Sequence, residues 1–276
     1  MINDECYRFE KIEYQYGLLD SCVDATYILH LESDIERMKH IESQLKMFQP
    51  SKVVYILYNK GYTKCNKGLH KNIPPVDLID AFITAFKHAK QKNYNNILVL
   101  EDDFIFDDEI KDQEVQMNIS SFLQDHSNET YIYVLGCLPY IRVPNPYYYN
   151  HNIALVKGGT HAIIYPILFR EKTLYKDQKT IEDWDIYTNI YSTQYMYKIP
   201  LCYQLFPMTE NRKNWFSVPI FSEFQDFLIY ILKLDKNVEP GYSFFYNFSY
   251  IILIFLIFLI FLILLCFFHY QKIFSQ

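Results

Sequence analysis

The feature that most restricts this chain is an uninterrupted apolar run near its C-terminus. Residues 251–268, IILIFLIFLIFLILLCFF, contain no charged side chain. As an α-helix this run would be about 27 Å long, which is close to the thickness of the hydrocarbon core of a bilayer. Aromatic residues crowd the stretch before it, and His269, Tyr270 and Lys272 follow it, as is typical of membrane interfaces. A buried core helix of this length rarely lacks every polar residue, so the sequence favours a single membrane span at about 250–268.

The span divides the chain into a folded domain, residues 1–240, and a membrane anchor, residues 241–276. The N-terminal stretch is charged and has no apolar core of the kind that signal peptides carry. We therefore expect a tail-anchored, single-pass protein whose domain lies on the cytosolic side. In that setting the Asn-x-Ser/Thr patterns at Asn118, Asn128 and Asn247 are expected to be idle, because N-glycosylation needs a lumenal context.

The six cysteines are interpreted as reduced structural thiols, an interpretation that fits the cytosolic placement. They are scattered along the chain, without a C-x-x-C pair or the spacing of zinc ligands. They are Cys6, Cys22, Cys65, Cys137, Cys202 and Cys266.

The composition narrows the class of protein. Aromatic residues make up 18% of the 276 residues and only 7 are Gly, which excludes a disordered or collagen-like chain. The formal net charge is −6 and no dense basic block is present, so nucleic acid is not the expected partner.

Strands and helices alternate in the first hundred residues. Apolar, β-branched runs at 25–31, 52–58 and 96–100 are typical of buried strands. Between them lie a helix that Ser33 or Asp34 would cap and Pro50 would end, and a helix after Pro74-Pro75. This β-α-β-α-β pattern predicts an α/β fold with an open, mostly parallel sheet flanked by helices.

The later elements are predicted less regularly. Expected are a helix at 113–125, a strand at 131–136, a Pro- and Tyr-rich loop at 138–150, two short strands within 154–165, helices at 167–176 and 181–191, a strand at 195–206, and a helix at 218–234.

Three carboxylates, Glu101, Asp102 and Asp103, directly follow the apolar strand 96–100. Like charges this close repel one another unless water or a cation compensates them. In α/β sheets ligands bind beyond the carboxyl ends of the strands, and hard carboxylate oxygens suit Mn²⁺ or Mg²⁺. A solvated strand end is the alternative. The acids at 107–109 are interpreted as charges at a helix start.

Three further motifs carry residues of chemical interest. His161 in Gly158-Gly159-Thr160-His161 is either near a metal or phosphate or a structural histidine. Residues 182–185, Glu-Asp-Trp-Asp, supply either a general base with Trp184 stacked on a sugar, or ordinary acids at a helix start. Arg212 and Lys213 either clamp a diphosphate or form an exposed basic pair.

Ordered pieces of the chain resemble the family-25 glycosyltransferases, the group of lipopolysaccharide-biosynthesis and collagen galactosyltransferases. The pieces are Tyr27–Leu31 with Glu36-Arg37, Ile97–Asp103 (similar to that family's V-L-E-D-D signature), Tyr133–Gly136, and Gly159–Ile164. The resemblance covers about residues 24–215. The segment CNKGLHKNIPPVDLIDAF has no clear counterpart of the Gly-Cys…Ser-His element that the family usually has.

The resemblance implies a GT-A fold, a nucleotide-sugar donor such as a uridine diphosphate sugar, Mn²⁺ (or Mg²⁺), and transfer with inversion. It implies residue roles as well. Asp103 would bind the metal, with Glu101 and His161 near it; Asp183 or Asp185 would be the catalytic base; and Leu31, Arg37, Glu101 and Asp102 would bind the donor. The loop motif described above adds Arg212 and Lys213 to the expected donor-binding residues.

We therefore expect a membrane-anchored, metal-dependent glycosyltransferase acting on an acceptor hydroxyl. The alternatives are a nucleotidyltransferase on a similar sheet and a membrane-tethered pseudoenzyme that binds a sugar or nucleotide without turnover.

Overall fold

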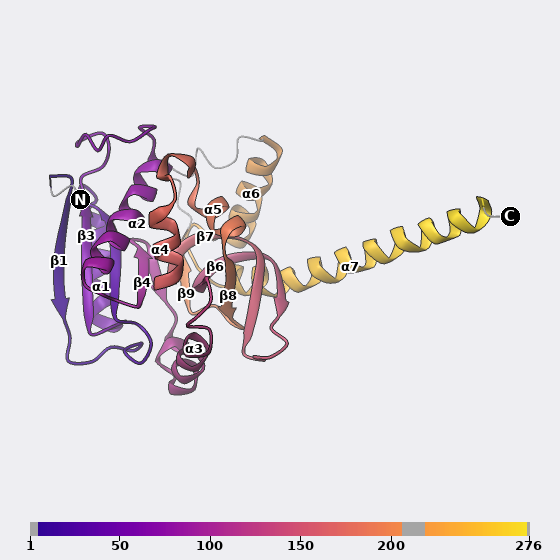
Figure 1. Ribbon diagram of the computed structural model, residues 1–276, viewed down its shortest axis with the longest axis horizontal. Helices are drawn as coiled ribbons and strands as arrows, with labels where there is room; N and C mark the ends of the chain where they lie inside the picture. Colours follow the sequence, from indigo (N-terminus) through magenta and orange to yellow (C-terminus); the bar gives the residue numbers. More distant parts are fainter. Residues whose placement is uncertain (1–4, 206–218, 275–276) are drawn as a thin grey trace.

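A computed structural model describes residues 5–205 and 219–274. A seven-stranded mixed sheet forms its centre, in the order β1-β3-β2-β4-β7-β6-β8, with helices on both faces (Figure 1). The strands are β1 (Tyr7–Glu13), β2 (Ala25–Leu31), β3 (Val53–Asn59), β4 (Asn96–Glu101), β6 (Tyr131–Pro144), β7 (His151–Pro166) and β8 (Thr193–Tyr197). A separate two-stranded sheet joins β5 (Phe104–Phe106) to β9 (Cys202–Gln204).

The helices are α1 (Ile35–Met47), α2 (Pro74–Gln91), α3 (Gln113–Asp125), α4 (Ile167–Tyr175), α5 (Trp184–Tyr191), α6 (Pro219–Leu232) and α7 (Gly241–Phe274), with short 3-10 turns η1 (Asp108–Lys111) and η2 (Gln178–Thr180). Five of the helices described, α1 to α5, divide between the two faces of the large sheet. One core layer holds α2, α4 and α5 against the sheet, and the other holds α1 and α3. Alternate residues of β2, such as Tyr27 and Ile28, enter opposite layers, as the two-residue period of a strand requires.

The predicted β-α-β-α-β core is confirmed. Strands β3, β2 and β4 are parallel neighbours. Asp34 caps α1 by accepting a hydrogen bond from the Arg37 backbone N–H at 3.0 Å. The rest of the sheet is mixed: β4 pairs antiparallel with β7 and β7 with β6, whereas β6 and β8 are parallel. The fold is therefore α/β with a parallel centre inside a mixed sheet.

The single strand expected at 195–206 is two strands, β8 and β9, which belong to different sheets. Two further predictions about the second half were wrong. Residues 138–144, expected in a loop, continue strand β6, and the two short strands expected around Gly158-Gly159 are one long strand, β7. Both errors come from Pro and Gly, which usually interrupt strands. Here the pairing of β6 with β7 shifts register between Pro139 and Ile141, and such an irregularity accommodates a residue that lacks an N–H.

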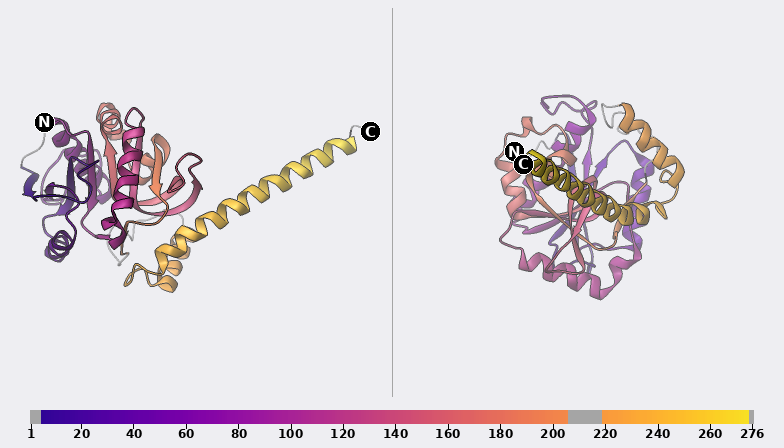
Figure 2. Two further views of the ribbon diagram at one scale, coloured as in Figure 1. Left: turned by 90° about the horizontal axis from the view of Figure 1, so that it is seen from below. Right: turned by 90° about the vertical axis from the view of Figure 1, so that its right-hand side faces the viewer.

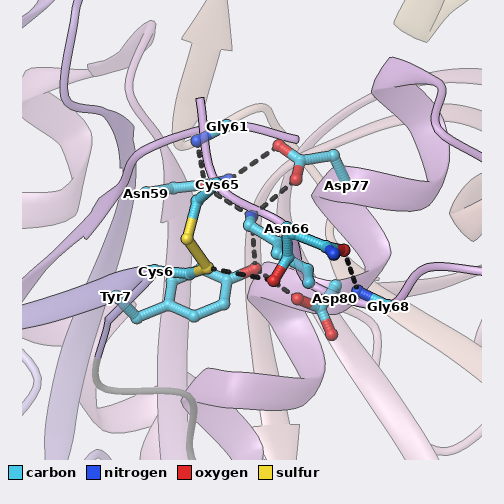
Figure 3. The surroundings of a disulfide bond; sticks show 10 residues. Cys6, Tyr7, Asn59, Gly61, Cys65, Asn66, Gly68, Asp77 and Asp80 are labelled. Carbon is cyan, nitrogen blue, oxygen red and sulfur yellow. Dashed lines mark hydrogen bonds and ion pairs between the residues drawn. A yellow bond between two sulfur atoms is a disulfide. The ribbon is translucent and has the colours of Figure 1, made fainter. Parts of the chain in front are cut away.

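The interpretation of all cysteines as reduced was also wrong. Cys6 and Cys65 form a disulfide with a Cα–Cα distance of 5.6 Å (Figure 3). The reason is strand β1, which the charged N-terminal sequence concealed: Tyr7 pairs with Asn59, so the residue before β1 meets the loop that follows β3. Cys22, Cys137, Cys202 and Cys266 are free.

Beside the disulfide lies a buried polar group that we call the Lys67 cluster: Tyr7, Asn59, Lys67, Asp77 and Asp80. The Lys67 ammonium donates to Asp77 Oδ1 and Asn59 Oδ1, each at 2.5 Å, and to the Tyr7 hydroxyl at 2.8 Å. Tyr7 in turn donates to Asp80 at 2.6 Å. Burial lowers the pKa of Lys67, but its three acceptors satisfy the ammonium.

Helix α7 projects far from the domain, and its Gly241–Phe267 stretch is long and apolar enough to cross a membrane (Figure 2). Its first turns are part of the domain, because Tyr242 and Tyr246 are buried. The buried Arg142 of β6 donates to Ser249 Oγ at 2.9 Å and to the Tyr246 carbonyl at 2.6 Å. The exposed apolar stretch starts two residues after Ser249, at Ile251.

Candidate functional site

The three acids at the end of β4, here called the β4 carboxylates, lie where the parallel strands end. Each carboxylate turns to a different partner. Glu101 Oε1 accepts from the Thr160 hydroxyl at 2.7 Å, and Asp102 Oδ2 lies 3.1 Å from His30 Nδ1. Asp103 Oδ2 pairs with Arg37 Nη1 at 3.2 Å and accepts from Gln204 Nε2 at 2.7 Å. These partners therefore offset part of the repulsion among the three carboxylates.

The sequence-predicted donor residues Leu31 and Arg37 do meet the β4 carboxylates. Leu31 is the last residue of β2, and its backbone N–H donates to Asp102 Oδ2 at 3.4 Å. Arg37 reaches Asp103 from the first turn of α1. Because β2 and β4 are parallel neighbours, the end of β2, the start of α1 and the end of β4 gather at one edge of the sheet.

Thr160 and His161 come to this edge along β7. The antiparallel pairing of Leu100 with Ala162 places Thr160 beside Glu101. His161 is fully buried, and its Nε2 lies 3.3 Å from the Cys202 carbonyl oxygen. Burial lowers its pKa to about 4, so the imidazole is neutral at pH 7. A Cβ on Gly136 would stand 2.4 Å from His161 Nε2, so this position accepts only glycine.

Asp183 and Asp185, the two expected catalytic acids, have different environments. The Asp183 carboxylate caps α5 by accepting from the Ile186 N–H at 2.8 Å. Asp185 Oδ1 lies 3.5 Å from the ammonium of Lys157, and burial raises the pKa of Asp185. Trp184 stacks on Phe82 in the core and donates to the Tyr165 hydroxyl, so the interpretation that it stacks on a sugar was wrong.

Lys157 is a residue of the site that sequence reasoning missed. Its side chain is fully buried and donates to the Gly159 carbonyl at 3.2 Å. The available signal was a lysine inside the apolar run ALVKGG, because a fully buried lysine needs a partner. Gln204 was also missed, since it reaches Asp103 only through the pairing of β5 with β9.

Glu101 is the acid with the most unusual protonation. Burial raises its pKa to about 7, and the nearby Asp185 and Asp102 add to the rise. Thr160 and Lys157 act in the opposite direction. The site therefore joins a carboxyl that is half-ionised near neutral pH to a second acid, Asp185, and a buried lysine.

Among the residues expected to hold a metal ion, Asp103 is the one whose surroundings suit that role. In the part of the chain that the structure describes, no three His, Cys, Asp or Glu side chains gather as a metal-ligand group. Glu101 and His161, both expected near the metal, face Thr160 and the Cys202 carbonyl instead. Asp103 Oδ1, however, is buried and has no hydrogen-bond partner among the described residues. One such carboxylate fits a hard cation that takes its other ligands from water and substrate phosphates.

Arg212 and Lys213, the expected diphosphate clamp, lie outside the described residues. The acids of residues 107–109 are at a helix start, as expected, because Asp107 caps η1 by accepting from the Glu109 N–H at 2.9 Å.

No protein-family model matches the chain, and no curated protein matches it.

Proposed function

We propose that this protein is a membrane-anchored glycosyltransferase that moves a sugar from a nucleoside-diphosphate donor to an acceptor hydroxyl. The observation that carries the proposal is that one stretch of β7 contacts both groups of acids: Thr160 donates to Glu101, and Lys157 pairs with Asp185. The resemblance of Ile97–Asp103 to the family-25 signature supports the same activity.

The donor's nucleoside diphosphate is proposed to lie over the ends of β2 and β4. Leu31 is 43% exposed there, and Arg37, in the first turn of α1, would exchange its pairing with Asp103 for a donor phosphate. Asp103 is the residue that would hold Mn²⁺ or Mg²⁺, through its unpartnered Oδ1. Such a cation neutralises a diphosphate and stabilises it as a leaving group.

Asp185 is proposed as the general base. The acceptor oxygen forms a bond to the anomeric carbon while the bond from that carbon to the diphosphate oxygen breaks. The acceptor proton passes to the Asp185 carboxylate, and the nucleoside diphosphate leaves with the electron pair. A single displacement of this kind inverts the anomeric centre. Lys157 keeps the Asp185 carboxylate oriented, and Asp183 is committed to the helix cap.

The test is release of nucleotide from a panel of nucleotide sugars with Mn²⁺, using the full chain in detergent. The full chain is needed because the first turns of α7 are packed in the domain. We expect release with at least one donor, and at least a tenfold loss in Asp103→Asn and Asp185→Asn. The matched control is Asp108→Asn, an exposed acid of the same segment that pairs with Lys111.

The outcomes separate the alternatives. Donor binding without release by the unmodified protein would support the pseudoenzyme. Incorporation of a nucleotide with release of pyrophosphate would support the nucleotidyltransferase. Full release in Asp103→Asn would overturn the assignment of the metal to Asp103.

A further inference from the structure

The disulfide bears on the side of the membrane that the domain faces. The cytosolic placement was supported by reading every cysteine as a reduced thiol, and the Cys6–Cys65 bond removes that support. Structural disulfides form and persist in oxidising compartments and are rare in the cytosol. The bond closes a loop with a sequence separation of 59 residues, so it ties together distant parts of the domain.

The free thiols of the domain are compatible with an oxidising compartment. Cys137 and Cys202 are fully buried and Cys22 is partly buried. Burial raises the pKa of the Cys22 and Cys137 thiols to about 12 and that of Cys202 further. Thiolates are the reactive form, so these cysteines resist oxidation and exchange. The fourth, Cys266, lies in the apolar stretch of α7.

The three Asn-x-Ser/Thr patterns differ in their secondary structure and in how exposed they are. Asn118 is within α3, partly buried, and its amide lies 3.3 Å from the Tyr197 hydroxyl. The pattern at Asn247 is within α7, and its Ser249 hydroxyl is buried against Arg142. Asn128 differs, because it is exposed in the turn that follows α3, where the Glu129 N–H donates to the His126 carbonyl at 2.9 Å. Acceptor asparagines lie in surface loops and turns.

We propose that the folded domain faces an oxidising compartment and that Asn128 is a site of N-linked glycosylation. The two observations are the disulfide and an acceptor pattern in an exposed turn of the same domain. The inference does not depend on the proposed transferase activity.

Both modifications have named reactants. The Cys6 and Cys65 thiols lose two protons and two electrons to a protein disulfide of the compartment, which is reduced to a dithiol. The Asn128 amide nitrogen loses a proton and bonds to the anomeric carbon of an oligosaccharide carried on a lipid diphosphate. The lipid diphosphate leaves with the electron pair, and Thr130 completes the pattern that is recognised.

The test is expression of the full chain in cultured eukaryotic cells, followed by gel mobility with and without peptide N-glycosidase. We expect one glycosidase-sensitive shift in the unmodified protein and in Thr130→Ser, which keeps the acceptor pattern. The shift should be absent in Asn128→Gln and in Thr130→Ala. Asn118→Gln is the matched control on α3 and should keep the shift.

Alkylation of the denatured protein is the second measurement. Without reductant a maleimide should label four of the six cysteines, and after reduction all six. A shift that persists in Asn128→Gln, or that disappears in Asn118→Gln, would overturn the assignment of Asn128. No shift in any form would also overturn it. Labelling of all six cysteines without reductant would overturn the oxidising compartment.

Discussion

The Lys67 cluster and the β4 carboxylates both contain aspartates at an edge of the same sheet, but they differ in whether the buried polar atoms have hydrogen-bond partners. In the Lys67 cluster a single buried ammonium has three acceptors within 2.8 Å. Among the β4 carboxylates, Asp103 keeps a buried oxygen without a hydrogen-bond partner in the described chain, and the pKa of Glu101 is about 7. A cluster whose buried polar atoms have hydrogen-bond partners stabilises the fold. A buried polar atom without a partner destabilises the fold, and a bound ligand can recover that free energy.

Breaking the Lys67 cluster should have the largest effect on stability. Lys67→Met leaves Asp77, whose side chain is 9% exposed, without its cation. Removing one partner of a buried ion pair destabilises a protein by about 3–5 kcal/mol. Thermal unfolding of the full chain in detergent should show a clearly lower midpoint. Lys39→Met, which breaks the exposed pair with Glu36, is the control and should leave the midpoint unchanged. Equal midpoints for the two variants would show that the cluster does not stabilise the fold.

Removing the disulfide beside that cluster should have the next largest effect. The Cys6→Ser, Cys65→Ser double variant frees a long loop in the unfolded chain and should lose about 2–4 kcal/mol. Because Lys67 follows Cys65 closely, combining this variant with Lys67→Met should cost less than the sum of the two effects. Strict additivity in denaturant unfolding would mean that the bond and the ion pair stabilise the loop independently.

Glu101→Gln should stabilise the protein, and the gain should depend on pH. The folded protein holds the Glu101 proton more tightly than the unfolded chain, in which the pKa is about 4.5. The stabilising contribution of Glu101 is therefore complete below pH 4.5 and is lost as the pH rises through about 7. Glutamine does not ionise, so the variant should gain up to about 3 kcal/mol over the parent by pH 8. Unfolding midpoints of both proteins from pH 4 to pH 8 measure this, with Asp108→Asn as the control. A gap that does not change with pH would contradict the raised pKa.

Removing Arg37, a partner of the β4 carboxylates, should have the smallest effect on stability and a large effect on nucleotide release. Arg37→Met removes a partly exposed ion pair, with side chains 23% and 14% exposed, and should change stability by less than about 1 kcal/mol. Nucleotide release should nevertheless fall at least tenfold, because Arg37 is proposed to bind the donor. If Arg37→Met lowered the stability of the protein but left nucleotide release unchanged, Arg37 would serve the fold and not the donor, and the prediction would be wrong.

The parallel centre of the fold could be predicted because local signals there agree with the tertiary structure. Strands β2, β3 and β4 are buried on both faces and are apolar almost throughout, and Asp34 caps α1 as expected. Strand β1 could not be predicted, because it is an edge strand whose outward residues are charged. The long strands β6 and β7 were divided at Pro and Gly, whose tolerance depends on the irregular pairing between them.

The candidate site was predictable where the chain itself brings residues together. Strand ends of a parallel sheet meet at one edge, and Leu31 and Asp102, at the ends of β2 and β4, are in contact there. The partners of the acids were not predictable. Gln204 is separated from Asp103 by 101 residues, and Lys157 from Asp185 by 28, so both contacts depend on pairings that no local pattern encodes.

The first turns of α7, the helix that is apolar enough to cross a membrane, contact a residue of the candidate site. The Tyr242 hydroxyl accepts from the Gln204 N–H at 2.9 Å and donates to the Gln204 carbonyl at 3.0 Å, and Gln204 binds Asp103. Arg142 holds the same helix to β6 through Tyr246 and Ser249, directly before the exposed apolar stretch begins at Ile251. In the proposed transferase, the membrane helix and the site therefore belong to one packed unit of the described chain. The fold would then set the distance between the site and the bilayer surface, and acceptors would have to come to that distance.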